Sequence, residues 1–242
     1  GDIAMQVARG LKDAGQEVGP DVIANTIRQV LEMELPEDVR KRYEEIHEMI
    51  LELPKYGNDI DEVDVLAREA AYFYTRPLET FKNPRGGMYQ AGLYPVSANV
   101  PLGAQTGATP DGRLAHTPVA DGVGPTSGFD ISGPASCNSV AKLDHAIASN
   151  GTLFNMKMHP TAMAGEKGLE SFISLIRGYF DQQGMHMQFN VVDRATLLDA
   201  QAHPEKYSGL IVRVAGYSAL FTTLSKSLQD DIIKRTEQAD NR

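Results

Sequence analysis

The segment Ile211–Ala219, which reads Ile-Val-Arg-Val-Ala-Gly-Tyr-Ser-Ala, contains the residue with the most distinctive chemistry in this chain, Gly216. A glycine Cα lies between an amide nitrogen that donates electron density and a carbonyl that withdraws it, so an unpaired electron on that carbon can delocalise over both. Any other residue adds a Cβ that crowds the planar form. The same string also fits a strand, Leu210–Val214, that turns at Gly216 into a helix. Taken alone, the segment leaves a stored carbon radical and a plain turn both open.

The wider sequence resembles the glycyl radical enzymes. Blocks similar to that family continue in order upstream of Gly216, from about residue 55 onward. These blocks are Tyr56–Asp59, Leu93–Ser97, Gly107–Arg113, Pro118–Gly122, Asn138–His145 and Ser149–Leu153. The resemblance implies that Gly216 carries the radical. It also implies that a separate activating enzyme installs the radical with S-adenosylmethionine and a [4Fe-4S] cluster, and that this chain binds no cofactor itself.

The resemblance also implies an α/β fold, in which this chain forms the C-terminal part of a ten-stranded α/β barrel. Residues 1–105 then belong to a partial pyruvate formate-lyase-like barrel domain, and residues 106–242 form the C-terminal glycyl radical domain. The radical loop is expected between a strand and the last helix. Tyr94 and Ser97 are expected to reach a buried substrate cavity, although a core tyrosine is an equally good interpretation of Tyr94. The complete enzyme is expected to be a homodimer that acts on a small molecule.

The single cysteine, Cys137, does not match the family's catalytic cysteine. That cysteine usually lies in a Gly-Cys-x-Glu setting on a loop upstream of everything seen here, whereas Cys137 lies in Pro-Ala-Ser-Cys-Asn-Ser, without a following Glu. A lone cysteine in a neutral setting is typically a small, buried, unreactive side chain. We therefore expect this chain to be a C-terminal portion that is inactive alone, and its start at Gly1 in place of Met fits that hypothesis.

Three blocks look closer to glycerol and diol dehydratases, and to their C–N and C–S lyase relatives, than to pyruvate formate-lyase. They are Asn138–His145, Ala148–Asn155 and Arg213–Ala219. We therefore expect a dehydratase-like lyase that breaks a C–O bond, or a C–N or C–S bond. Acyl transfer of the pyruvate formate-lyase kind is the alternative activity, and addition to fumarate, as in the fumarate-adding synthases, is a third. A non-enzymatic hypothesis is that the chain is a stand-alone subunit that restores the radical of a partner protein.

Composition excludes several other classes of protein. The net charge of −9 argues against a nucleic-acid or membrane surface as the main partner. No apolar run approaches the ~20 residues of a membrane span, and one cysteine fits a reducing compartment, so a cytoplasmic protein is expected. The histidines form no close pair such as His-Glu-x-x-His, so no metal site is predicted.

Hydrophobic spacing predicts the main elements. Apolar residues three and four apart indicate helices at Asp21–Val30, Glu37–Leu53, Ile60–Thr75 and Gly168–Phe180. In the third of these, Leu66 and Tyr74 are expected on the inner face. The remaining predictions are a strand at Met185–Val192, a helix capped by Asp193 that runs to Gln201, and a final helix at Lys226–Thr236 capped by Ser225, with Leu228, Ile232 and Ile233 turned inward.

Overall fold

The computed structural model describes residues 37–238 of the chain, which divides into two compact units, residues 1–50 and 51–242. The predicted helix Asp21–Val30 lies outside the described residues. Helix α3 (Glu37–Glu52) confirms the next prediction and begins with two acidic residues, which favour the positive end of a helix. Within residues 37–238, no helix combines the length and the apolar character that a membrane crossing requires.

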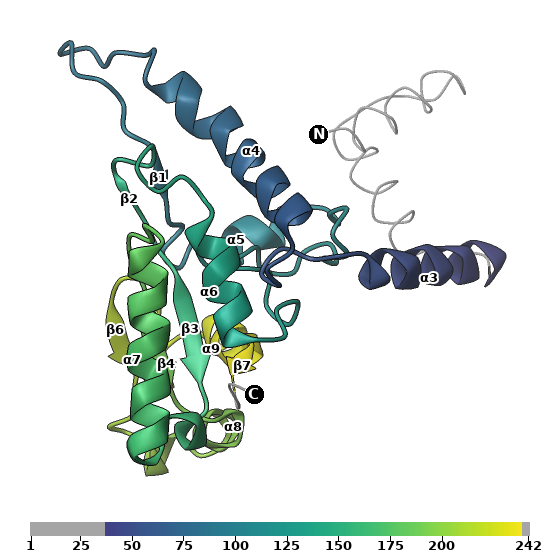
Figure 1. The fold of residues 1–242 in the computed structure, drawn as a ribbon. Helices are drawn as coiled ribbons and strands as arrows, with labels where there is room; N and C mark the ends of the chain where they lie inside the picture. The colour runs from purple at the N-terminus through teal and green to yellow at the C-terminus, as the bar shows by residue number, and fades with distance from the viewer. Residues whose placement is uncertain (1–36, 239–242) are drawn as a thin grey trace. The chain divides into compact units, whose positions relative to one another are not determined.

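The second unit is a mixed α/β structure (Figure 1). In chain order its helices and strands are α4 (Asp61–Leu78), β1 (Gly92–Leu93), α5 (Asn99–Ala104), α6 (Gly133–Ala141), β2 (Gly151–Thr152), β3 (Asn155–Met158), α7 (Gly165–Asp181), β4 (Gln188–Val191), α8 (Arg194–Ala202), β5 (Ile211–Arg213), β6 (Ser218–Leu220), α9 (Lys226–Lys234) and β7 (Glu237–Gln238). Short 3-10 turns occupy Pro160–Met163, Pro204–Lys206 and Phe221–Thr223.

A three-stranded sheet of order β4-β3-β7 lies at the centre of this unit, and both of its strand pairs are parallel. Helix α7 connects β3 to β4, as parallel neighbours require, because a tight turn cannot return the chain to the same end of a sheet. Strands β1 and β2 form a separate parallel pair, and β5 and β6 form an antiparallel hairpin.

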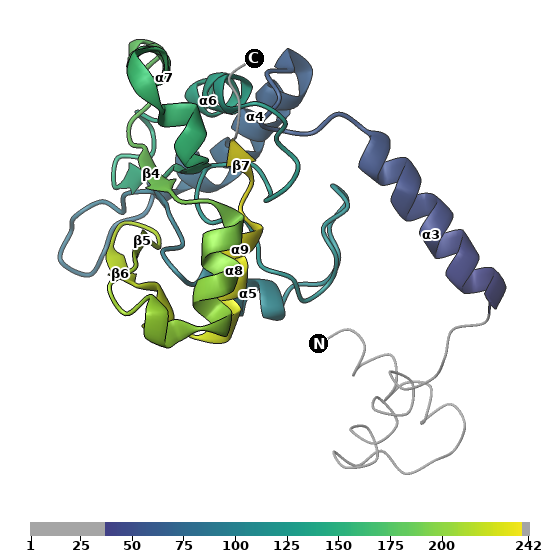
Figure 2. The ribbon, with the colours of Figure 1, turned by 90° about the horizontal axis from the view of Figure 1, so that it is seen from below.

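The two faces of the β3–β4 sheet differ in chemistry because neighbouring residues of a strand point to opposite sides. Met156 and Met158 of β3 belong to an apolar core with Val140 of α6 and Leu175 and Tyr179 of α7. Figure 2 shows α6 and α7 on one side of the sheet and α8 and α9 on the other. The residues that alternate with the two methionines are polar, and they are directed toward α9 and the β5–β6 hairpin.

A second apolar core joins α8, the hairpin and α9. Leu197 and Val212 are fully buried there, together with Phe221. The predicted inner residues of the last helix are confirmed, since Leu228, Ile232 and Ile233 all belong to this core. The hairpin is therefore packed against the last helix by apolar contacts, while its other contacts go to the polar face of the sheet.

Several local predictions need correction. The buried side of α4 carries Asp64 and Thr75, whereas Leu66 is 69 % exposed and Tyr74 is 50 % exposed. Lys142 reaches from the end of α6 to Asp64 at 2.9 Å, and this ion pair accompanies the burial of Asp64. Asp193 caps α8 as predicted, by accepting from the Thr196 amide at 2.7 Å, but the Ser225 side chain makes no capping hydrogen bond to α9.

Candidate radical site

Gly216 lies in the tight turn of the β5–β6 hairpin. The strands pair Val212 with Ala219 and Arg213 with Ser218, and the Val214 amide then donates to the Tyr217 carbonyl at 2.9 Å. Gly216 is the third of the four turn residues and has φ +79°, a value that glycine adopts without steric cost. A strand does precede the predicted loop, but a second strand, β6, separates that loop from α9. The sequence reading did not anticipate this strand.

Burial changes abruptly along the turn. The side chains of Val214 and Ala215 are fully buried, whereas Gly216 and Tyr217 are exposed within the described residues. A Cβ built on Gly216 would lie 3.4 Å from Cδ1 of Leu153, so the positive φ, more than the available space, is what favours glycine here. The turn is thus anchored through the buried residues that precede its glycine.

Strand β4 supports the turn through two side-chain amides on the polar face of the sheet. The Gly216 amide donates to Oε1 of Gln188 at 3.2 Å, and Nη2 of Arg213 donates to the same oxygen at 2.9 Å. Asn190 bonds both backbone groups of Arg213, each at 2.7 Å. Because Gln188 and Asn190 are two positions apart on one strand, both point to the hairpin. Gln188 and Asn190 therefore contact the backbone that leads up to Gly216 from its amide side.

Arg235, just after α9, is a second support of the turn and comes from a different part of the chain. Its Nη1 donates to the Val214 carbonyl at 2.7 Å, and its Nη2 donates to Asp231 at 3.1 Å. Its Nε lies 2.9 Å from a carboxylate oxygen of Asp121. Burial raises the pKa of Asp121, and the positive charge of Arg235 opposes that shift. The guanidinium is itself buried, so the two carboxylates compensate a charge that would otherwise be costly.

Asn155 connects these two supports. Its side-chain amide donates to the Asp121 carboxylate at 2.9 Å and its side-chain oxygen accepts from Nε2 of Gln188. A closed ring of polar contacts therefore begins and ends on the turn. We refer to this ring as the glycyl clamp; its members in order are Gly216, Gln188, Asn155, Asp121, Arg235 and Val214.

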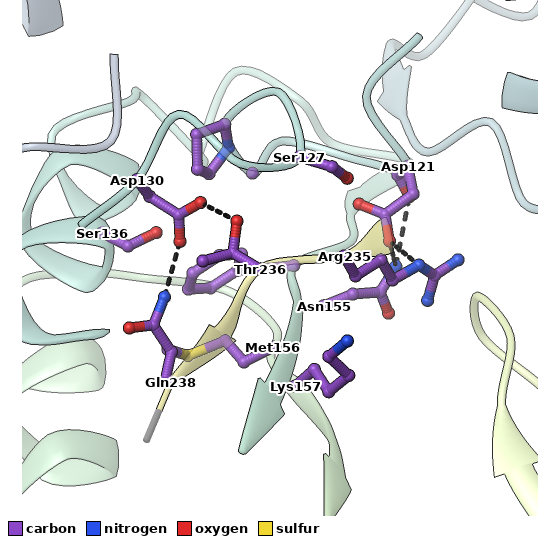
Figure 3. A pocket seen from close by; sticks show the side chains of 13 residues that line it. Asp121, Ser127, Asp130, Ser136, Asn155, Met156, Lys157, Arg235, Thr236 and Gln238 are labelled. Carbon is purple, nitrogen blue, oxygen red and sulfur yellow. Dashed lines mark hydrogen bonds and ion pairs between the residues drawn. The ribbon is translucent and has the colours of Figure 1, made fainter. Parts of the chain in front are cut away.

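A small polar cavity lies beside the clamp (Figure 3). Asp121, Asn155 and Arg235 line one part of it, and Asp130, bonded to Thr236 and Gln238, lines another. Its volume of about 30 Å³ suits a single water molecule. The cavity is too small for an organic substrate, so a substrate would have to bind elsewhere.

The predicted substrate residues, Tyr94 and Ser97, are related to the glycyl turn through Leu153. The Leu153 amide donates to the Leu93 carbonyl at 3.3 Å, and Cδ1 of Leu153 lies 3.4 Å from the position that a Cβ on Gly216 would occupy. Tyr94 follows Leu93, is 38 % exposed, and its hydroxyl accepts from Asn150 at 2.8 Å. Ser97 is half-buried in the turn that follows. The structure therefore brings the end of strand β1, which Tyr94 follows, close to the glycyl turn through Leu153.

Cys137 is buried in α6, as expected. Its Sγ lies 3.6 Å from Sδ of Met156, and burial raises the pKa of the thiol to about 12. A thiol with such a pKa is protonated at neutral pH, which matches an unreactive core residue.

One cluster of three carboxylates, Asp59, Asp61 and Asp64, occurs within residues 37–238 with the spacing of a metal site. Lys142 Nζ lies 2.6, 2.7 and 2.9 Å from them, so an ammonium already balances their charge. His145 is equally structural, because Nε2 donates to the Val140 carbonyl and Nδ1 accepts from the Thr152 hydroxyl.

The sequence did not lead us to predict a functional role for Gln188, Asn155, Asp121 or Arg235. Of the clamp, only the turn that contains Gly216 was predicted. The signal was present in the two strand sequences, Asn-Met-Lys-Met for β3 and Gln-Phe-Asn-Val for β4. Polar side chains that alternate with apolar ones in a buried strand indicate that one face of the strand is polar. The polar groups on that face need hydrogen-bond partners elsewhere in the fold. Arg235 follows Asp231 at the helical spacing of four, which also marks a charge pair facing one side.

Comparison with known families agrees with a site of this kind. A family model described as "Glycine radical" matches residues 119–222, which include Asp121, Asn155, Gln188 and Gly216. A second, described as "Pyruvate formate lyase-like", matches residues 26–103. The chain belongs to the glycyl radical enzyme family.

The relatives are mostly much longer proteins. A solved structure, "1,2-propanediol Dehydration in Roseburia inulinivorans; Structural Basis for Substrate and Enantiomer Selectivity", has 97 % sequence identity and a TM-score of 0.92, over 98 % of this chain and 28 % of that chain. The glycerol-bound B12-independent glycerol dehydratase from Clostridium butyricum has 60 % identity and a TM-score of 0.80, over 82 % and 25 %. The "Probable dehydratase YbiW" of Escherichia coli (strain K12) is 51 % identical over 76 % of this chain and 24 % of its own length. The chain thus spans about a quarter of the length of these proteins.

Proposed function

We propose that this chain is the glycyl radical part of a dehydratase and that Gly216 is the radical carrier. The observation that carries the proposal is the glycyl clamp, which devotes buried amides, a carboxylate and a guanidinium to holding the backbone around one glycine. Buried polar groups are costly unless they are paired, so such a set is seldom gathered around an ordinary surface turn.

In the proposed cycle, the Gly216 radical takes a hydrogen atom from a cysteine outside this sequence. The thiyl radical takes a hydrogen atom from a hydroxyl-bearing substrate carbon, and the C–O bond on the neighbouring carbon breaks. The departing hydroxyl group leaves as water with the proton of the remaining hydroxyl group, which becomes a carbonyl. The product radical then recovers a hydrogen atom from the thiol, and the resulting thiyl radical takes a hydrogen atom from Gly216, which regenerates the glycyl radical. Cys137 is unsuited to the thiyl role because it is buried between α6 and β3.

The 97 % identity to a protein described by 1,2-propanediol dehydration favours a small vicinal diol as the substrate class. We place Tyr94 and Ser97 at the substrate cavity, since they follow strand β1, whose Leu93 adjoins the glycyl turn through Leu153. Tyr94→Phe and Ser97→Ala should then raise KM with little change in thermal stability. An unchanged KM in both variants would remove them from the site.

The finer architecture belongs to the same proposal. Residues 1–105 would contribute to a ten-stranded α/β barrel and residues 106–242 would form the glycyl radical domain. A radical S-adenosylmethionine enzyme with a [4Fe-4S] cluster would install the radical at Gly216. The complete enzyme would be a cytoplasmic homodimer.

The test is anaerobic turnover by the complete enzyme after activation. With 1,2-propanediol we expect propanal and water in equal amounts, and Gly216→Ala should form neither. Glycerol and the pair pyruvate and coenzyme A are the comparison substrates. Formate release from the last pair, without turnover of either diol, would exclude the dehydratase assignment in favour of acyl transfer.

A second measurement separates a catalytic part from a restoring subunit. Affinity capture of this chain from its source cells should recover it within one long polypeptide that contains the catalytic cysteine. Recovery as a separate short chain bound to a large partner would contradict the proposal.

A further inference from the structure

Within residues 37–238, the hydrogen bonds that reach the glycyl turn from outside the hairpin lie on the amide side of Gly216. Gln188 accepts from the Gly216 amide, and Arg235 donates to the Val214 carbonyl. On the carbonyl side, the hydrogen bonds of Tyr217 and Ser218 within these residues go to the hairpin itself. The described residues therefore hold the amide side of this Cα more firmly than its carbonyl side.

This asymmetry matters because the resting backbone at Gly216 does not suit a delocalised radical. When a glycine Cα loses a hydrogen atom it becomes planar, and conjugation with the amide nitrogen requires that the preceding peptide plane be coplanar with it. That condition corresponds to φ near 180°, whereas Gly216 has φ +79°. Radical formation must therefore rotate one side of the turn, and the carbonyl side has fewer anchors.

The anchored side carries the electron-donating group. Oε1 of Gln188 accepts from the Gly216 amide, and an acceptor at that position increases the electron density of the nitrogen and so its donation to the radical carbon. The direction of this oxygen is set by its neighbours, since Arg213 donates to it and the Gln188 amide group donates to Asn155. A side chain held at both of its polar atoms cannot follow the turn when it moves.

We propose that Gln188 is a positioning residue for the radical at Gly216, one that holds the amide side in place and strengthens nitrogen donation while the carbonyl side rotates. This inference depends on the proposed function, because it assigns a role at the same radical. It predicts that the Gly216 amide remains hydrogen-bonded to Gln188 in the radical state.

The experiment uses the complete enzyme labelled with ¹⁵N-glycine, activated anaerobically and examined by electron–nuclear double resonance. Gln188→Met removes the acceptor, so the ¹⁵N coupling of Gly216 should decrease and the radical should decay about three- to tenfold faster, as expected for the loss of one hydrogen bond. Gln188→Glu keeps an acceptor oxygen and makes it anionic, so the coupling should increase.

A matched control is Gln201→Met. Gln201 is also a partly buried glutamine of the same domain, but its amide donates to Gln229 and Asp230, away from the glycyl turn. The coupling and the lifetime should both stay at the wild-type values. If Gln188→Met does not fold, the increase in the Gln188→Glu variant alone carries the test.

The outcomes separate this inference from the function on which it depends. Absence of a glycyl signal in the activated wild-type enzyme would overturn the proposed function. A normal wild-type signal, with unchanged coupling in Gln188→Met and Gln188→Glu, would leave the radical at Gly216 and refute the role of Gln188. Shifts of both variants in the same direction would also refute it, because a merely structural disturbance does not distinguish the two side chains.

Discussion

Asn190 pairs with the backbone of Arg213 as a neighbouring strand would. Its side-chain amide donates to the Arg213 carbonyl and its side-chain oxygen accepts from the Arg213 amide, both at 2.7 Å. The hairpin lies across the polar face of the sheet, and within residues 37–238 no further strand pairs with β5 on that side. One asparagine side chain thus supplies the two hydrogen bonds that would otherwise be missing.

Replacing this asparagine should loosen the hairpin. Asn190→Leu leaves two backbone groups of Arg213 without partners, and each buried unpaired group costs about 1–3 kcal/mol. We expect a decrease of about 2 kcal/mol in the free energy of unfolding, measured by calorimetry on the complete enzyme. A change below about 0.5 kcal/mol would show that water replaces the amide without loss.

The radical assignment makes a spectroscopic prediction. The activated enzyme should give an electron paramagnetic resonance doublet from the remaining α-hydrogen of Gly216, and Gly216→Ala should abolish it. The alanine variant must be shown to fold, since its Cβ would be strained at φ +79°. A doublet of undiminished intensity in the folded variant would place the radical elsewhere.

Oxygen should cut the chain at the radical site. Oxygen added to the Gly216 Cα forms a peroxyl species that decays by breaking the backbone, so air should release a C-terminal fragment that begins at about Tyr217. This fragment contains α9, whose Leu228, Ile232 and Ile233 are buried, so the loss should be irreversible. Intact-mass spectrometry should detect it in activated protein only; equal cleavage without activation contradicts the assignment.

Cys137 should be dispensable for turnover. Burial raises the pKa of its thiol to about 12, and its Sγ lies against Met156 in the apolar core. We expect Cys137→Ser to retain most of the turnover and to lower stability by about 1–2 kcal/mol, because a hydroxyl replaces a weakly polar thiol in the core. Loss of turnover in a folded variant would make Cys137 a participant in the reaction.

The buried His145 should make stability depend on pH. Burial lowers the pKa of this imidazole, so the unfolded chain binds a proton at a higher pH than the folded chain does. The stability contributed by the neutral ring is complete above the unfolded pKa of about 6.5 and is lost as the pH falls toward the lower folded value. His186 has a pKa lowered in the same direction, so it should add to the effect.

The comparison for this prediction is the melting temperature between pH 7 and pH 5. In His145→Gln the decrease over that range should be smaller than in the wild type, although the variant is less stable at pH 7. An unchanged slope in His145→Gln would assign the pH dependence to other groups.

Local sequence was sufficient for features whose physics is local. The three- and four-residue spacing of apolar side chains predicted α3, α7 and α9 to within a few residues, because a helix repeats on that scale. Asp193 was recognised as a cap for the same reason, since its partner is only three residues away. The conformational freedom of Gly216 and the isolation of Cys137 also follow from residue types and their immediate neighbours.

Only the tertiary structure determined which polar groups meet. Gln188 and Gly216 are 28 residues apart, and Asn99 reaches Asp231 across 132 residues, so neither contact is visible in a local pattern. The buried position of Asp64 on α4 was not predicted either, because its partner Lys142 is 78 residues away in the sequence. An amide or a carboxylate can satisfy its hydrogen bonds with many partners, and the sheet and hairpin must first be folded before one partner is selected.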